Sequence, residues 1–167
     1  TGSMYWGQTG FEAGKFRFNA TNEGWYLETI KFQYGDGDTA ATFTNNVKQV
    51  QMVYKDESGN NLTATQLPES TGSASFGFSG STRPFVPKDS SLDVILKLDV
   101  KTKAEGATRG SKVFSVMFNG GDASMFRAVG ASSGVVLTGT SANIVDRDAN
   151  SDHNVYRVFP KFDQVAL

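Results

Sequence analysis

The stretch SSLDVILKLDVKTK, from Ser90 to Lys103, decides the fold. Apolar residues occupy alternate positions from Leu92 to Val100 and charged residues fall between them, with Ile95 the one exception. Successive side chains of a β-strand point to opposite faces, so this stretch has one apolar and one charged face. We therefore predict a central strand of an antiparallel sheet, with the apolar face on the core and the charged face in water.

Shorter segments that we interpret as strands or short elements flank this strand on both sides. They are residues 15–20, 25–34, 47–55, 62–67, 73–79, 112–119, 125–129, 135–138 and 154–160. The intervening segments are rich in Gly, Asn, Asp and Ser, which favour turns. We predict that residues 15–20 and 25–34 form a hairpin, that residues 62–67 form an edge strand, and that residues 35–46 are a loop. No segment has the period and length of a helix, so the pattern predicts an all-β sandwich or barrel.

The composition favours one β-rich domain. The chain has 167 residues, enough for a real core, and we predict a single domain over residues 1–167. Thirteen Phe, five Tyr and two Trp suit the pleated surfaces of strands. We interpret residues 1–4 (TGSM) as a tag remnant outside the fold, and residues 160–167 as a linker or a strand exchanged with a neighbour.

Charge and cysteine content exclude several classes of protein. The chain has 16 basic and 17 acidic residues, so it lacks the basic surplus that nucleic acids and anionic membranes attract. It has no Cys, which removes disulfides, thiolate metal sites and a cysteine nucleophile. No apolar run approaches the roughly 18 residues of a membrane-spanning helix, so we expect no membrane insertion.

Four segments, taken in order, resemble a known family. They are KFRFNATNEGWYLETIKFQY (15–34), VKQVQMVYKDESGN (47–60), FVPKDSSLDVILKLDVKTK (85–103) and NVYRVFPKFDQV (154–165). Their strand and turn patterning resembles the tandem immunoglobulin-like β-sandwich repeats of large bacterial cell-surface proteins, especially those of reduced-genome candidate phyla. The resemblance implies an immunoglobulin-like antiparallel β-sandwich of about 8–10 strands. It also implies an extracellular or cell-surface location.

An acidic segment, DRDANSD, suggests a calcium site. Its oxygen-bearing residues alternate, and they are Asp146, Asp148, Asn150 and Asp152. This spacing matches the first half of a calcium loop, in which alternate side chains converge on a hard cation. The glycine and the final glutamate of that loop are missing, so further ligands such as Asp36 and Asp38 would be needed. The competing interpretation is a solvated polar loop.

Aromatic residues at two places suggest a carbohydrate site. They are Tyr5, Trp6, Trp25 and Tyr26. The C–H faces of sugars pack on flat rings, so these four could form a stacking platform. The competing interpretation is packing in the core, because one of two adjacent residues on a strand points inward.

No catalytic constellation is recognisable, and we expect no enzyme. His153 is the only histidine, and no nucleophile motif accompanies it. Paired carboxylates for glycoside hydrolysis have no signature in the spacing of the acidic residues.

Three functional hypotheses remain. The first is an extracellular structural or adhesive domain, one unit of a larger surface or filament assembly, whose partners are neighbouring domains or copies of itself. It predicts that the two termini lie at opposite ends of the sandwich. The alternative is a carbohydrate-binding module with glycans as partners and, with the acidic loop, a structural Ca²⁺. The third is a filament subunit completed by strand exchange through its C-terminal tail.

Overall fold

The computed structural model describes most of the chain up to Thr108 and shorter segments beyond it. The described residues are 3–35, 38–108, 113–114, 116–118, 124–139, 147–148 and 153–156. For residues 3, 113–114, 147–148 and 153–156 the description covers the backbone alone. The C-terminal tail 160–167, predicted as a linker or exchanged strand, lies outside these residues.

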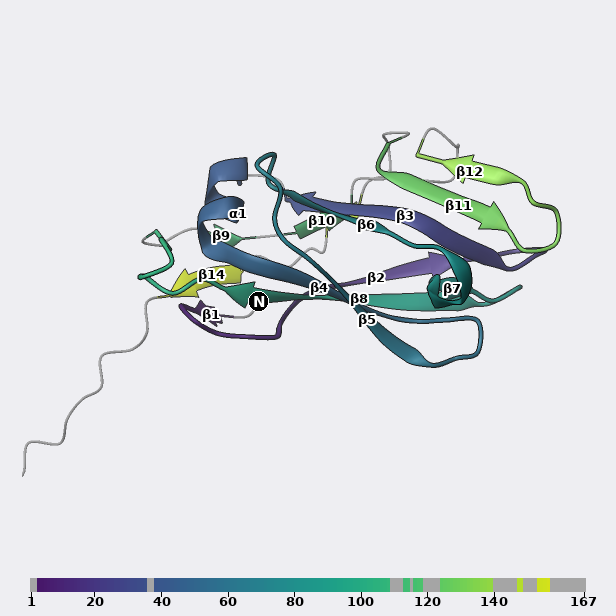
Figure 1. Cartoon of the computed structure of the whole chain (residues 1–167), viewed down its shortest axis with the longest axis horizontal. Coiled ribbons are helices and arrows are strands. Elements are labelled where there is room, and N and C mark those ends of the chain that lie inside the picture. The colour runs from purple at the N-terminus through teal and green to yellow at the C-terminus, as the bar shows by residue number, and fades with distance from the viewer. Residues whose placement is uncertain are drawn as a thin grey trace, which may run out of the picture.

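The four-stranded sheet is built around the alternating stretch between Ser90 and Lys103. Its antiparallel order is β2 (Phe11–Asn19), β8 (Ser91–Val100), β4 (Val47–Lys55) and β5 (Asn61–Gln66) (Figure 1). β8 lies between β2 and β4, and its alternate residues from Leu92 are buried. The predicted central strand is therefore confirmed, and so is the predicted edge strand at β5.

The seven-stranded sheet is built around β3 (Trp25–Tyr34). One edge of β3 pairs with β7 (Phe85–Val86) and β6 (Ser73–Gly77). The other edge pairs with β11 (Phe126–Gly130) and β10 (Val116–Phe118). Beyond these strands lie β12 (Val136–Thr138), next to β11, and β13 (Arg147–Asp148), next to β10. All these pairings are antiparallel.

The two sheets pack face to face and enclose an aromatic core, so the fold is an all-β sandwich. Phe16 of β2 and Phe32 of β3 meet with ring centroids 5.0 Å apart, and Phe18 contacts both Phe118 and Phe126. The predicted hairpin of residues 15–20 and 25–34 is wrong. β2 pairs with β8, and β2 and β3 face each other across the core, because each buries its apolar face there.

The segment predicted as a loop at residues 35–46 contains α1 (Ala40–Asn46). Thr39 caps this helix, since its Oγ1 accepts a hydrogen bond from the Thr42 backbone N–H at 3.1 Å. Phe43 is buried and anchors the helix to the core. Seven residues make too few turns for a helical period to appear in the sequence. A short 3₁₀ helix, η1 (Gly80–Thr82), precedes β7.

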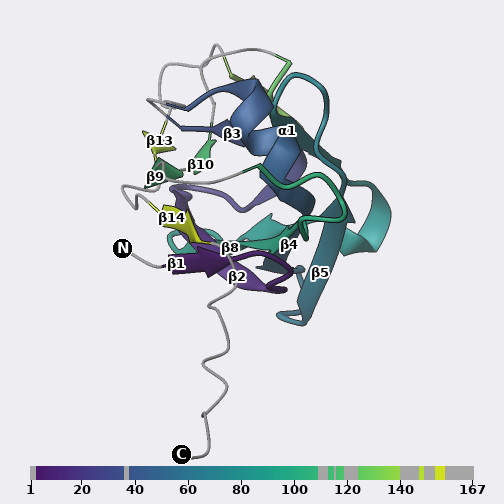
Figure 2. The same cartoon turned by 90° about the vertical axis from the view of Figure 1, so that its left-hand side faces the viewer.

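Both ends of the described chain lie at one end of the sandwich, here called the terminal end. β1 (Ser3–Tyr5) pairs in parallel with β14 (His153–Tyr156), which also pairs with β9 (Val113–Phe114). Figure 2 looks onto this end and shows β1 and β14 side by side. The prediction of termini at opposite ends stays untested, because residues 157–167 lie outside the described residues. Met4 is 1% exposed and belongs to the core, so residues 1–4 do not all lie outside the fold as predicted.

The opposite end of the sandwich, here called the far end, carries the start of β8 and the turns joining β2 to β3 and β11 to β12 (Figure 1). The ten residues of β8 separate the two ends by about 30 Å. At the terminal end, Gly7 donates to the Lys101 carbonyl and Val100 donates to the Gln8 carbonyl. At the far end, Ala20 donates to the Ser90 carbonyl.

Candidate functional site

The outer face of the seven-stranded sheet carries a row of apolar and aromatic side chains near the far end. The row consists of Phe85, Tyr26, Val129 and Val136, one from each of β7, β3, β11 and β12. Each pairs directly with the next, and directly paired residues share a face of the sheet. Three of them are half-buried and Val136 is 43% exposed. We call these four residues the apolar row.

A β-bulge in β3 places a carboxylate beside the apolar row. The pairing of β3 with β11 skips one residue between Leu27 and Thr29, which leaves Glu28 as the extra residue. The bulge directs Glu28 to the outer face, where it contacts two arginines. Arg83 Nη1 donates to Glu28 Oε1 at 3.2 Å, and Arg127 Nε donates to Glu28 Oε2 at 2.7 Å. One half-buried carboxylate thus holds two guanidinium groups.

Tyr26 is enclosed by its neighbours. The guanidinium carbon of Arg83 lies 4.0 Å from the centre of the Tyr26 ring, at the distance of a cation–π contact. The Phe85 ring lies 5.0 Å away, centroid to centroid. A hydrogen bond with the Glu57 carboxylate, and next desolvation, raise the pKa of the Tyr26 hydroxyl. Because Arg83 covers one face of its ring, Tyr26 does not offer that face to a sugar.

Glu23 fixes the β11–β12 turn to the β2–β3 turn. Its carboxylate accepts hydrogen bonds from the backbone N–H groups of Ser132 and Ser133, both at 3.0 Å, and from the Ser133 hydroxyl at 2.6 Å. The Ser133 hydroxyl, more than the backbone donors, lowers the pKa of Glu23. Ala131 also donates to the Gly24 carbonyl. The strand that carries Val136 is thereby tied to the rest of the sheet.

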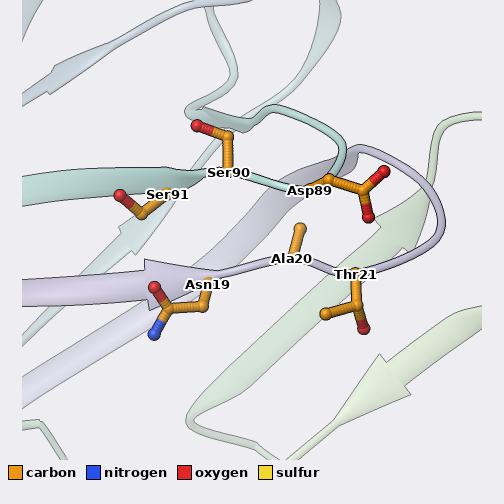
Figure 3. A pocket seen from close by; sticks show the side chains of 6 residues that line it. All are labelled: Asn19, Ala20, Thr21, Asp89, Ser90 and Ser91. Carbon is orange, nitrogen blue, oxygen red and sulfur yellow. The ribbon is translucent and has the colours of Figure 1, made fainter.

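A shallow hollow lies where β2 ends and β8 begins, also at the far end. Its lining residues are Asn19, Ala20, Thr21, Asp89, Ser90 and Ser91. Figure 3 shows that the Asn19 amide and the Asp89 carboxylate point away from each other. Asp89 Oδ1 is already engaged, because it accepts a hydrogen bond from the Asn22 backbone N–H. The hollow offers hydroxyl and amide groups without a convergent pair of acids or bases.

The structure does not bring the four predicted aromatic residues together. Tyr5 and Trp6 lie at the terminal end, while Trp25 and Tyr26 lie near the far end. Trp25 pairs with Val86 and packs against the core, and Tyr26 lies on the outer face, as strand alternation requires. Trp6 also packs against the core. Of the four, Tyr26 alone takes part in the apolar row.

The predicted calcium ligands lie almost wholly outside the described residues. This applies to Asp146, Asn150, Asp152 and Asp36, while Asp148 is described by its backbone alone, in β13. Among the described residues, no three His, Cys, Asp or Glu side chains gather in a group that could hold a metal ion. The calcium site therefore stays a prediction.

Most residues of the apolar row, and the charged residues Glu28, Arg83 and Arg127 beside it, were not predicted from the sequence as site residues. One signal was present, because Glu28 interrupts the alternation of WYLETIKFQY at the position of the bulge. Its partners Arg83 and Arg127 stand 55 and 99 positions further along the chain. A single sequence carries no mark of such a pairing.

Comparison with protein-family models, with curated proteins and with solved structures found no match to this chain. Within the part of the chain that the structure describes, no helix combines the length and the apolar character required to cross a membrane.

Proposed function

We propose that this domain is a non-catalytic adhesive domain on the outside of a cell, carried by a larger surface protein. We propose further that its sandwich is immunoglobulin-like, which the patterning of residues 15–34, 47–60 and 85–103 supports. In this proposal the domain is attached to the larger protein through its terminal end, and the units are not joined end to end.

The observation that carries the proposal is the parallel pairing of β1 with β14. Because Ser3 pairs with Asn154 and Tyr5 pairs with Tyr156, the first and the last described strands lie together at the terminal end. In this proposal, both connections to the larger surface protein are made there. A domain attached in this way presents its far end and the neighbouring outer face away from its anchor. Binding residues commonly lie on loops and faces positioned by a rigid scaffold of this kind.

A carbohydrate-binding module is the second candidate, and the apolar row favours it. Sugar-binding surfaces combine apolar side chains with a few oriented polar groups, and Phe85, Val129 and Val136 lie beside Glu28 and Arg127. The two candidates are compatible, since an adhesive domain can attach a cell through a glycan. They differ in whether the bound surface is a polysaccharide or a protein.

Binding of the isolated domain to immobilised polymers tests the proposal. The panel comprises acidic polysaccharides, neutral polysaccharides and extracellular-matrix proteins, with a fluorescent protein fused to either terminus of the domain. We expect binding to at least one polymer, equal for the two fusions, and no release of reducing ends on incubation. Binding that either fusion abolishes, binding to none of the polymers, or release of reducing ends would contradict the proposal.

A further inference from the structure

We propose that Arg127, together with Val129 and Val136, binds a carboxylated sugar of an acidic polysaccharide. This inference rests on the proposed adhesive function and names the chemical class of its ligand.

Arg127 is held in a fixed orientation, and its two Nη groups remain as hydrogen-bond donors for a ligand. Its Nε donates to Glu28, and within the described part of the chain its hydrogen bonds use that nitrogen alone. The side chain is 45% exposed. An arginine held through Nε presents its two Nη groups side by side, in the geometry that binds a carboxylate through two parallel hydrogen bonds.

Among the three arginines whose side chains the structure describes, Arg127 alone has this arrangement. Arg17, on the outer face of the four-stranded sheet, donates from Nε and Nη2 to both oxygens of Asp93. Arg83 donates from Nε to the Gly80 carbonyl and from Nη1 to Glu28, and it is stacked on Tyr26. Both have two nitrogens engaged inside the domain, whereas Arg127 has one.

Apolar side chains lie at the distance that a sugar ring requires. Val129 stands two residues after Arg127 on the same face of β11, which separates them by roughly 7 Å. Val136 pairs with Val129 and extends the apolar surface to the edge of the sheet. A uronic acid carries a carboxylate at one edge and an apolar C–H face, so a single sugar residue can contact Arg127 and the two valines together.

The surroundings of Arg127 favour a carboxylate over a phosphate polymer. Binding a nucleic acid or polyphosphate uses many cations at once, because each neutralised phosphate contributes to affinity. Here Arg127 pairs with Thr29 and Thr138, Val129 lies next along the same face of β11, and the whole chain has a net charge of -1. One oriented guanidinium beside an apolar surface fits one carboxylate on each bound sugar.

The site is preformed, which lowers the entropy that binding must overcome. Arg127, Val129 and Val136 all stand on paired strands. Glu23 ties the turn between these strands to the β2–β3 turn. The arrangement therefore exists before any ligand arrives.

Affinity electrophoresis of the whole chain tests the inference, with the polymer cast into a native gel. The polymers are polygalacturonate, the same polymer with its carboxylates methyl-esterified, neutral dextran, and dextran sulfate. The variants are Arg127→Gln and the matched control Arg17→Gln, and thermal unfolding checks that each is folded. A third variant, Arg127→Lys, keeps the charge and removes the paired donors.

We expect polygalacturonate to retard the wild type and Arg17→Gln equally, and Arg127→Gln to lose about 10-fold or more in affinity. Arg127→Lys should bind between these two, and esterification should abolish the retardation. Unchanged binding by folded Arg127→Gln, equal binding of the esterified polymer, or equal binding of dextran sulfate would overturn the inference. Binding to dextran without binding to polygalacturonate would overturn it and leave the proposed function standing.

Discussion

Arg17 and Arg127 lie on the outer faces of the two sheets, and each is paired with a carboxylate. Arg17 forms a two-nitrogen pair with Asp93 on the neighbouring strand, and Lys15 lies 2.8 Å from the same carboxylate. These contacts lower the pKa of Asp93 and join β2 to β8. Arg127 shares Glu28 with Arg83 and keeps its two terminal nitrogens outside that pair. The same residue type thus links strands on one sheet and is available to a ligand on the other.

The difference follows from how the two sheets are built. The four-stranded sheet consists of long strands whose neighbours pair along most of their length, so its outer charges find partners on adjacent strands. In the seven-stranded sheet, β3 is paired with four shorter strands and contains a bulge at Glu28. The pairings of β2 and β4 with β8 also shift register, so the shortness of the strands beside β3 is what distinguishes the second sheet. We therefore expect stability to depend mostly on the first sheet and binding on the second.

The largest effect is expected from Leu96→Ala in the middle of β8. Leu96 is fully buried, so the change removes apolar contacts and leaves a cavity, at a cost of about 2–5 kcal/mol in the free energy of unfolding. Urea denaturation followed by Trp fluorescence measures it. Val136→Ala, on the outer face of the other sheet, is the control and should change that free energy by less than about 0.5 kcal/mol. Equal losses in the two variants would contradict the division of roles.

The next largest effect is expected from Asp99→Ala at the terminal end of β8. Asp99 is buried and accepts hydrogen bonds from the Gly10 backbone N–H at 2.7 Å, from Gln49 at 2.7 Å and from Gln51 at 3.2 Å. Its removal leaves these donors without an acceptor, which costs about 1–3 kcal/mol. Asp99→Asn keeps one acceptor oxygen and should lose less by the same urea measurement. If Asp99→Asn lowered the free energy of unfolding as much as Asp99→Ala, the charge of Asp99, and not its hydrogen bonding, would be what matters here.

A smaller effect is expected from Glu28→Gln at the bulge. The amide has one acceptor oxygen in place of two, so it cannot hold Arg83 and Arg127 together. We expect a loss of about 1 kcal/mol or less in the free energy of unfolding, and a few-fold weaker binding of polygalacturonate. Glu28→Asp, which keeps the charge, should recover part of the affinity. Full affinity in folded Glu28→Gln would show that the carboxylate does not orient Arg127.

The smallest effect is expected from the titration of Glu69 beside the seven-stranded sheet. Hydrogen bonds from Ser75, Lys31 and Ser73, that from Ser75 being the strongest, lower its pKa to about 2. A lowered pKa stabilises the fold above the unfolded value of about 4.3, and the stabilisation is lost as the pH falls towards 2. The contribution is below about 1 kcal/mol, because the side chain is 39% exposed. The difference in melting temperature between the wild type and Glu69→Gln should shrink from pH 5 to pH 2, and a constant difference would contradict it.

The sequence predicted local features well and long-range ones poorly. The alternation in β8 and in β5 indicates which face of each strand is turned to the core, because the polarity of each side chain is visible in the sequence. The sequence does not show which strands pair with each other. The prediction therefore assigned β2 and β3 to one hairpin, although they belong to different sheets. Likewise α1 is too short for its period to show.

The candidate site was predicted only in part, for the same reason. Tyr26 was one of the four aromatic residues predicted as a stacking platform, and strand alternation explains why it and not Trp25 faces outward. Arg127 could not be recognised, because its role depends on a carboxylate 99 residues away and on two valines brought beside it by strand pairing. Glu28 interrupts the alternation of residues 25–34, and the β-bulge is the structural cause of this interruption.

The affinity of Arg127→Gln for polygalacturonate, measured beside that of Arg17→Gln, tests the central claim most directly. Both substitutions remove one positive charge from an outer face, so any difference between them reports the local arrangement and not the net charge. We predict about a 10-fold or greater loss for Arg127→Gln and an unchanged affinity for Arg17→Gln. Equal affinities in two folded variants would contradict the claim that the outer face of the seven-stranded sheet is the binding surface.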